Sequence, residues 1–254
     1  MSEQPEVFTH PALAGAAHGF LGRSGGVSTG LHAGLNVSYS EDEPAHTAEN
    51  RRRAGEAVLQ GARLLTCYQI HSPDVVTVTA PWDDADRPKA DALVTDQPGL
   101  LLGVLTADCA PVLFHDPQAG VIGAAHAGWK GAIGGVTDRT VEAMEVLGAQ
   151  RSRIAAVVGP CIAQKSYEVD TGFEARFTGE AAENARFFRA GRARHSWFDL
   201  EGYVAARLAA FGVGTVGMLG EDTYSQAERF YSFRRSTHAG EAGYGRQISL
   251  IGLA

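Results

Sequence analysis

Three residues of this 254-residue chain place reactive side chains at the ends of apolar segments: His71, Cys109 and His126. Cys109 follows the apolar run 100–105, and His126 follows the apolar run 121–125. Both runs are short and interrupted by glycine, which indicates buried strands rather than helices. Small residues beside Cys109 and His126 allow a ligand to approach the backbone closely. We therefore expect a pocket where these strands end.

Two imidazoles and one thiolate form a ligand set for zinc, and a set of three leaves the fourth tetrahedral position open for water. Zinc lowers the pKa of such a water to about 7. The same residues also fit a thiol enzyme, with Cys109 as nucleophile and His126 or His71 as base. Each has a structural interpretation as well, because a lone buried cysteine is usually a small hydrophobe. The residue types alone leave these alternatives open.

The sequence gives weaker evidence for a function of Asp108, Cys67 and Cys161. Asp108 could orient a catalytic base, but adjacent residues on an extended chain point to opposite faces. We therefore expect Asp108 to bind a different group. Cys67 is expected in the core, and Cys161 near the pocket because it follows a predicted strand over 154–158.

Composition limits the classes of partner. The formal net charge of −7 argues against nucleic acid or an anionic membrane as the main partner. No apolar run approaches the ~20 residues needed to span a bilayer, and the N-terminus lacks the basic and apolar regions of a signal peptide. Three cysteines without short spacing suit a reducing compartment. We expect a cytoplasmic protein.

Helices and strands alternate irregularly, which indicates one α+β domain over residues 1–254 with mixed sheets. Helices are expected over 44–60 and 131–147, and over 200–211 after a cap at Asp199. The segment 166–191 is expected to be helical in parts. Strands are expected over 64–70, 75–78, 91–95, 100–105, 111–114, 121–125, 154–158, 215–219, 230–235 and 246–251. The run Arg51-Arg52-Arg53 is interpreted as a solvated helix face.

A loop over 22–28 is rich in glycine and hydroxyl side chains. Such loops can point several backbone N–H groups at an anion, and Arg23 could add a bidentate contact. The alternative is an ordinary surface turn. The loop lacks the Gly-Lys-Ser/Thr ending of a P-loop.

Six motifs in order connect the chain to a known family. They are Gly19-Phe20 with Arg23-x-Gly25-Gly26-Val27-Ser28, Gln69-x-His71-Ser72, Ala90-Asp91-Ala92, Thr106-Ala107-Asp108-Cys109-x-Pro111, His126-Ala127-Gly128-Trp129-Lys130-Gly131, and Gly159-Pro160-x-Ile162 followed by Tyr167-Glu168-Val169. On them the chain resembles the bacterial purine nucleoside phosphorylases once called laccase-domain proteins or multicopper polyphenol oxidases, also described as peptidoglycan editing factors. The resemblance runs from about His18 to the C-terminus.

The resemblance implies two mixed sheets packed together under outer helices, similar to the deamidating domain of bacterial necrotizing toxins. It implies phosphorolysis of adenosine, inosine, guanosine and methylthioadenosine, and hydrolytic deamination of adenosine. It also implies a zinc ion bound by His71, Cys109 and His126. Arg23 is the expected phosphate ligand, and Lys130 a weaker candidate because the family often has arginine there.

Two further functions remain as alternatives. A peptidoglycan editing factor would hydrolyse a UDP-MurNAc precursor that carries serine in place of alanine, and a Cys–His thiol hydrolase would use Cys109 directly. Multicopper oxidase chemistry is disfavoured because it needs His-x-His and His-Cys-His clusters. No two of the nine histidines are adjacent or one residue apart. A zinc-stabilised binding module is also disfavoured, since three ligands leave a position open. The sequence leaves monomer and homodimer both open.

Overall fold

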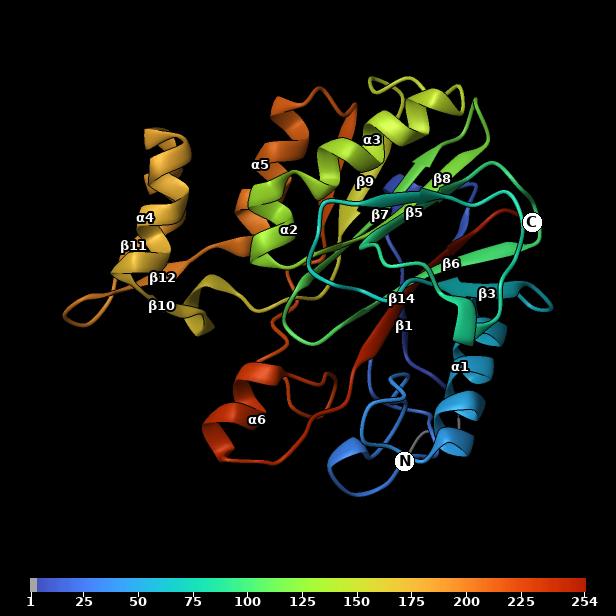
Figure 1. Ribbon diagram of the computed structural model, residues 1–254, viewed down its shortest axis with the longest axis horizontal. Coiled ribbons are helices and arrows are strands. Elements are labelled where there is room, and N and C mark those ends of the chain that lie inside the picture. Colours follow the sequence, from blue (N-terminus) through green and yellow to red (C-terminus); the bar gives the residue numbers. More distant parts are fainter. Residues whose placement is uncertain (1–3) are drawn as a thin grey trace.

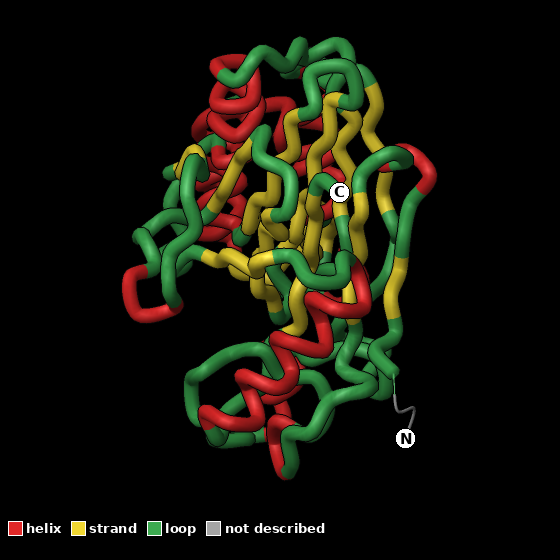
Figure 2. The backbone as a smooth tube through the Cα atoms, turned by 90° about the vertical axis from the view of Figure 1, so that its right-hand side faces the viewer, coloured by secondary structure: helices red, strands yellow, loops and turns green. Residues whose placement is uncertain are grey.

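Two mixed β-sheets lie face to face in the computed structural model, which describes residues 4–254 (Figures 1 and 2). In spatial order, the five-stranded sheet contains β1 (Val7–Phe8), β2 (Ala17–Leu21), β14 (Gln247–Gly252), β6 (Leu100–Thr106) and β3 (Arg63–Thr66). The six-stranded sheet contains β13 (Thr215–Met218), β9 (Ala155–Val158), β7 (Ala110–Asp116), β8 (Val121–Ala127), β5 (Ala92–Thr95) and β4 (Val75–Thr77). Each sheet combines parallel and antiparallel pairs, which confirms the predicted α+β class with mixed sheets.

The central strands read as continuous apolar runs because both of their faces are buried. In β6, Leu102 faces the layer between the sheets, whereas its neighbour Leu101 faces the outer layer on the other side. In β7, Leu113 faces the same central layer and Phe114 faces outward. All four side chains are fully buried. The alternation of strand side chains therefore supplies three apolar layers from two sheets.

Helices cover both outer faces of the pair of sheets. α1 (Pro44–Val58) packs on the five-stranded sheet, and α3 (Val136–Val146) with α5 (Leu200–Ala210) packs on the six-stranded sheet (Figure 1). The side chain of Asp199 accepts a hydrogen bond from the Gly202 N–H, so the predicted cap of α5 is confirmed. Short 3₁₀ turns occupy Pro11–Leu13, Gly30–His32, Asp84–Asp86, Gln164–Ser166 and Ala182–Phe187.

Three predicted elements differ in the structure. The strand expected over 64–70 ends at Thr66, as β3. The helix expected over 131–147 is two helices, α2 (Trp129–Gly134) and α3, because Gly135 adopts a left-handed conformation with φ 89°. The strand expected over 230–235 is wrong. There the chain enters helix α6 (Phe233–Ala239), and the Ser232 hydroxyl accepts a hydrogen bond from the Arg235 N–H as its N-cap.

The segment 166–191 is helical in parts as predicted, over Thr171–Glu180 and Ala182–Phe187, and it also supplies two strands of a third, three-stranded sheet. Its strands are β10 (Glu168–Asp170), β12 (His195–Phe198) and β11 (Phe188–Ala190), and α4 (Thr171–Glu180) lies against it at one side of the molecule (Figure 1). Each strand is only three or four residues long, too short for a clear pattern in sequence. Within residues 4–254, none of the helices has the length and apolar character needed to cross a membrane.

The interpretation of the arginine run as a solvated face is wrong for one of its members. Arg51 is only 6% exposed and donates hydrogen bonds to the Val37 carbonyl, the Thr66 hydroxyl and the Asp84 carboxylate. Arg52 is exposed and pairs with Glu49 on the helix surface. Arg51 thus joins α1 to the edge of the five-stranded sheet.

We expect R51A to lower the free energy of unfolding by about 2–4 kcal/mol, because buried acceptors lose a charged donor. The adjacent R52A removes only a surface pair and serves as the matched control, with no measurable change expected. Urea unfolding followed by circular dichroism measures both. Equal midpoints for the two variants would contradict a structural role for Arg51.

Candidate metal centre and its cavity

The chain passes from the five-stranded to the six-stranded sheet at two places, and each crossing carries one of the predicted ligands. The segment between β3 and β4 contains His71, and the segment between β6 and β7 contains Cys109. Pro111 at the start of β7 pairs with His126 at the end of β8. This register places Cys109, which precedes β7, beside His126.

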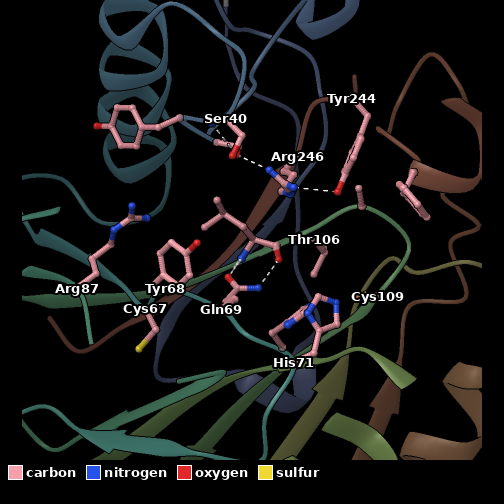
Figure 3. A pocket seen from close by; sticks show the side chains of 16 residues that line it. Ser40, Cys67, Tyr68, Gln69, His71, Arg87, Thr106, Cys109, Tyr244 and Arg246 are labelled. Carbon is pink, nitrogen blue, oxygen red and sulfur yellow. Dashed lines mark hydrogen bonds between the residues drawn. The ribbon is translucent and has the colours of Figure 1, made fainter. Parts of the chain in front are cut away.

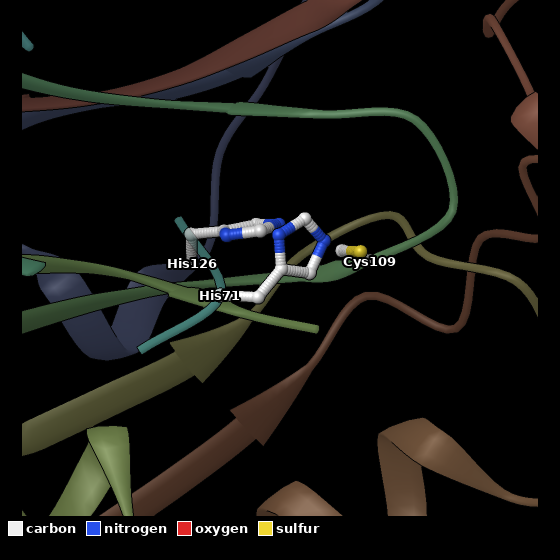
Figure 4. A group of neighbouring side chains, drawn as sticks. All are labelled: His71, Cys109 and His126. Atoms are coloured by element: carbon white, nitrogen blue, oxygen red, sulfur yellow. The ribbon is translucent and has the colours of Figure 1, made fainter. Parts of the chain in front are cut away.

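The structure brings these three side chains together (Figure 4). One donor atom from each residue lies within 4.8 Å of the other two, and the two imidazole rings meet edge to face with centroids 4.9 Å apart. Tetrahedral zinc holds such donors about 3.4–3.6 Å apart, so small side-chain movements bring them onto one ion. A Cβ atom on Gly128 would lie 3.0 Å from Cys109 Sγ and 3.0 Å from a carbon of His71. Only glycine leaves this space free.

A carboxylate that no prediction assigned holds both histidines. Asp91 is fully buried and accepts hydrogen bonds from the backbone N–H groups of residues 70, 71 and 72 at 2.7–3.0 Å. His71 has φ 61°, a left-handed conformation that makes successive N–H groups converge on an anion. Asp91 also lies 2.8 Å from His126 Nδ1. That contact leaves Nε2 of His126 as the ligand atom, the arrangement of many metal-bound histidines.

The charged groups of this cluster shift one another's pKa values. Burial alone raises the pKa of the Asp91 carboxyl, but hydrogen bonds from His126 and the backbone lower it to about 2. Burial likewise opposes ionisation of Cys109, yet the neighbouring His126 and His71 lower its pKa to about 6. The cluster therefore favours a thiolate, which can act as a metal ligand or as a nucleophile.

This environment distinguishes Cys109 from the other two cysteines. Burial raises the pKa of Cys67 to about 12 and raises that of Cys161 well above its usual range. We expect iodoacetamide at pH 7 to alkylate Cys109 alone in metal-free protein, since the thiolate is the reactive form. Mass spectrometry of tryptic peptides measures this, with Cys67 and Cys161 as internal controls. Equal labelling of all three in the folded protein would contradict it.

The cluster lies at one end of a cavity of about 590 Å³ (Figure 3). The wall includes four phenylalanine and tyrosine rings, two guanidinium groups and three serine or threonine side chains: Tyr39, Tyr68, Phe233, Tyr244, Arg87, Arg246, Ser38, Ser40 and Thr106. A cavity of this size holds a small organic ligand. The Gln69 side chain fixes its floor, because its amide donates to the Leu105 carbonyl and accepts from the Leu105 N–H at 2.8 Å each.

Asp108 binds a different group from the histidines, as predicted. Its carboxylate accepts hydrogen bonds from the Thr223 hydroxyl, the Ser232 hydroxyl and the Arg234 N–H at 2.6–2.9 Å. Because Ser232 caps α6, this carboxylate also positions Phe233 on the cavity wall. Asp108, the residue next to Cys109, thus connects the His71, Cys109 and His126 cluster to the part of the wall that contains Phe233.

Of the two remaining cysteines, Cys67 lies in the core as predicted, whereas the prediction for Cys161 is wrong. Cys67 is buried as predicted but also lines the cavity. Cys161 is buried in the apolar layer between the six-stranded sheet and its helices, and it does not line the cavity.

The structure does not bring Arg23 or Lys130 onto the cavity wall. The Arg23 guanidinium donates to the carbonyls of Ala227 and Ala33 and stacks 4.6 Å from the Tyr231 ring centre. Glycines of its loop pack against backbone: a Cβ on Gly26 would lie 2.2 Å from the Gly34 carbonyl oxygen. Lys130 is exposed at the start of α2. Phosphate binding by either residue stays a prediction without geometric support.

Sequence reasoning missed Asp91 as a positioning residue and Arg246 as a wall residue. Asp91 carried a faint signal, since it belongs to one of the six motifs, but its partners lie 19–35 residues away. Arg246 carried none, because a single arginine before a strand has no distinctive spacing.

The comparisons with known proteins cover nearly the whole chain. The family model described as "Multi-copper polyphenol oxidoreductase laccase" matches residues 17–254. A protein of Deinococcus radiodurans named purine nucleoside phosphorylase is 44% identical over 249 residues, which cover 96% of this chain and 91% of that protein. Purine nucleoside phosphorylase ORF3 of Streptomyces griseus is 40% identical over 244 residues, 93% of this chain and 96% of that protein.

Solved structures agree with the fold. YlmD from Geobacillus stearothermophilus superposes with a TM-score of 0.88 at 30% identity, covering 96% of this chain and 94% of that one. A Neisseria meningitidis protein superposes with a TM-score of 0.87 at 31% identity, covering 98% and 99%. Among residues 4–254, His71, Cys109 and His126 are the one group of three or more potential ligands with donor atoms this close.

Proposed function

We propose, from the premise that this chain belongs to the multi-copper polyphenol oxidoreductase laccase family by its match over residues 17–254, that it is a metal-dependent purine nucleoside phosphorylase. The observation that carries the proposal is the cluster of His71, Cys109 and His126 at one end of a cavity large enough for a nucleoside. The names of its relatives, at up to 44% identity, support the same reaction class.

The residues of the cluster fit one zinc ion. The two imidazoles and one thiolate match zinc's preferred donors, and Asp91 orients His126 as metal-bound histidines require. When bound, zinc supplies a Lewis acid with one open position. Within residues 4–254 the single group of three ligands provides no second or third copper position, so we assign zinc rather than copper. Anomalous X-ray scattering at the zinc edge identifies the ion and measures its distances to the three donors.

In phosphorolysis the bond between ribose C1′ and purine N9 breaks, a phosphate oxygen bonds to C1′, and the purine leaves with a proton. The chain contributes binding and orientation to this step. Phe233 and Tyr244, with ring centroids 5.1 Å apart, form an aromatic wall suited to a purine ring. Phe233 is 50% exposed and lines the cavity, as a group that becomes covered by ligand would do.

The finer part of the proposal concerns substrates. Adenosine, inosine, guanosine and methylthioadenosine are the proposed nucleosides, and hydrolytic deamination of adenosine at C6 is a proposed second reaction. Both reactions place a purine in the same cavity, but deamination consumes water and not phosphate. This difference separates the two activities experimentally.

The test is an assay of purified, metal-loaded protein with inosine, with and without phosphate. We expect hypoxanthine and ribose 1-phosphate in equal amounts, only when phosphate is present, with loss of activity on chelation and recovery with zinc. Hypoxanthine release at the same rate with and without phosphate would indicate a hydrolase instead. No nucleoside turnover, together with serine-containing cell-wall precursors accumulating in a gene deletion, would favour the peptidoglycan editing alternative.

A further inference from the structure

Arg246 extends from the residue before β14 to the wall of the cavity (Figure 3). One terminal nitrogen of its guanidinium donates to the Ser38 hydroxyl at 2.5 Å, and the other donates to the Tyr244 hydroxyl at 2.8 Å. The guanidinium carbon lies 4.7 Å from the centre of the Tyr244 ring. These contacts hold a half-buried cation in one orientation.

Nothing in the described part of the chain neutralises this cation. Within residues 4–254, no carboxylate oxygen lies within 4.0 Å of the Arg246 guanidinium. Arg87, the other guanidinium on the wall, has Asp84 at 3.8 Å. Partial burial of an unpaired charge is unfavourable. A cation held by neutral hydroxyls beside an open cavity is therefore arranged to receive an anion from outside the chain.

The two bonds leave donors of the guanidinium unused. Arginine carries five N–H groups in a planar fork, and the contacts to Ser38 and Tyr244 occupy two of them. The fork matches a tetrahedral oxyanion, which can accept two of the remaining N–H groups at once. Ser40 and Thr106 line the same cavity, and Thr106 Oγ1 is buried without a hydrogen-bond partner in the described structure.

We infer that Arg246 is the oxyanion-binding residue of this cavity and that in phosphorolysis it receives the phosphate. This inference rests on the proposed function for the identity of the anion as inorganic phosphate. The role of phosphate ligand, expected of Arg23 and Lys130, is thereby assigned to a residue that lines the same cavity as His71, Cys109 and His126. The phosphate is then held between Arg246 and the ribose, while the purine contacts the aromatic wall.

The test compares R246M and R246K with R189M, which removes an exposed arginine on β11. For R246M we expect the KM for phosphate to rise roughly 10- to 100-fold, the range for one charged hydrogen-bond partner, while the KM for inosine changes less than 3-fold. R246K keeps the charge but loses the fork, so an intermediate rise is expected. R189M is expected to match the wild type. Adenosine deamination, which uses no phosphate, is expected to persist in both Arg246 variants.

Calorimetric titration of inorganic phosphate into the metal-loaded wild type separates this inference from the proposed function. Phosphate binding that weakens in R246K and R246M supports the site even if no nucleoside is cleaved. Phosphorolysis with the same phosphate KM and the same phosphate affinity in wild type and R246K would overturn it. If R246M fails to fold, R246K decides the question alone, because lysine retains the aliphatic stem and the charge.

Discussion

Replacing Cys109 with alanine is expected to remove the metal and to lower phosphorolysis by roughly 10³-fold or more, the loss that follows when several kcal/mol of metal-derived stabilisation disappears. Two histidines alone remain as ligands, and two ligands do not hold zinc in the manner of a catalytic site. Metal content by plasma emission spectrometry and conversion of inosine to hypoxanthine are measured on the same preparation.

The control for this variant is C161A, which removes a cysteine that is buried in the core away from the cavity. It is expected to keep its metal and its turnover at temperatures well below its melting point. Loss of metal from C109A without loss of turnover would remove zinc from the mechanism. Turnover that disappears while the metal stays bound would instead favour Cys109 as a nucleophile with His126 as base.

Replacing Asp91 with asparagine is expected to weaken metal binding by 10- to 100-fold, the effect usual for a residue that orients a metal-bound histidine. The amide group substitutes a donor for one acceptor oxygen, so at least one of the N–H groups at residues 70–72 or His126 Nδ1 loses its partner. These groups are buried, and we expect a loss of about 2–4 kcal/mol in the free energy of unfolding.

Competition with a chromophoric chelator measures the metal affinity of D91N, and urea unfolding of the metal-free protein measures its stability. D74N provides the comparison, because Asp74 is an exposed carboxylate in the segment between β3 and β4 that carries His71. Equal metal affinities for D91N and D74N would show that Asp91 serves the fold alone.

The sequence predicts the central strands well, and the reason is physical. Strands such as β7 and β8 are buried on both faces, so their apolar runs need no long-range information to be recognised. The places of Cys109 and His126 at the strand ends follow from the same runs. The arrangement of two packed mixed sheets with outer helices came from the motif resemblance, and the solved structures confirm it.

The features that the sequence does not predict depend on contacts between segments that are far apart along the chain. The segment 230–235 reads as a strand by its aromatic residues, yet Asp108 holds Ser232 and Arg234 from more than 120 positions away and supports the start of a helix. Arg51 reads as a surface residue because its acceptors on Val37, Thr66 and Asp84 come from three other segments. The role of Arg246 can be inferred only from the folded chain, in which it lies on the cavity wall.

The two crossings between the sheets link the metal centre to the layer that separates them. His71 and Cys109 lie on segments that leave neighbouring parallel strands, β3 and β6, and enter the six-stranded sheet, where β8 supplies His126. The distances between the ligand atoms of His71, Cys109 and His126 therefore depend on the position of one sheet relative to the other. An ion bound there resists that shear, and by linkage it slows amide hydrogen exchange at this corner of both sheets. A smaller side chain in place of Leu113, in the layer between the sheets, is then expected to weaken metal binding from a distance, since a close-packed interior transmits displacement.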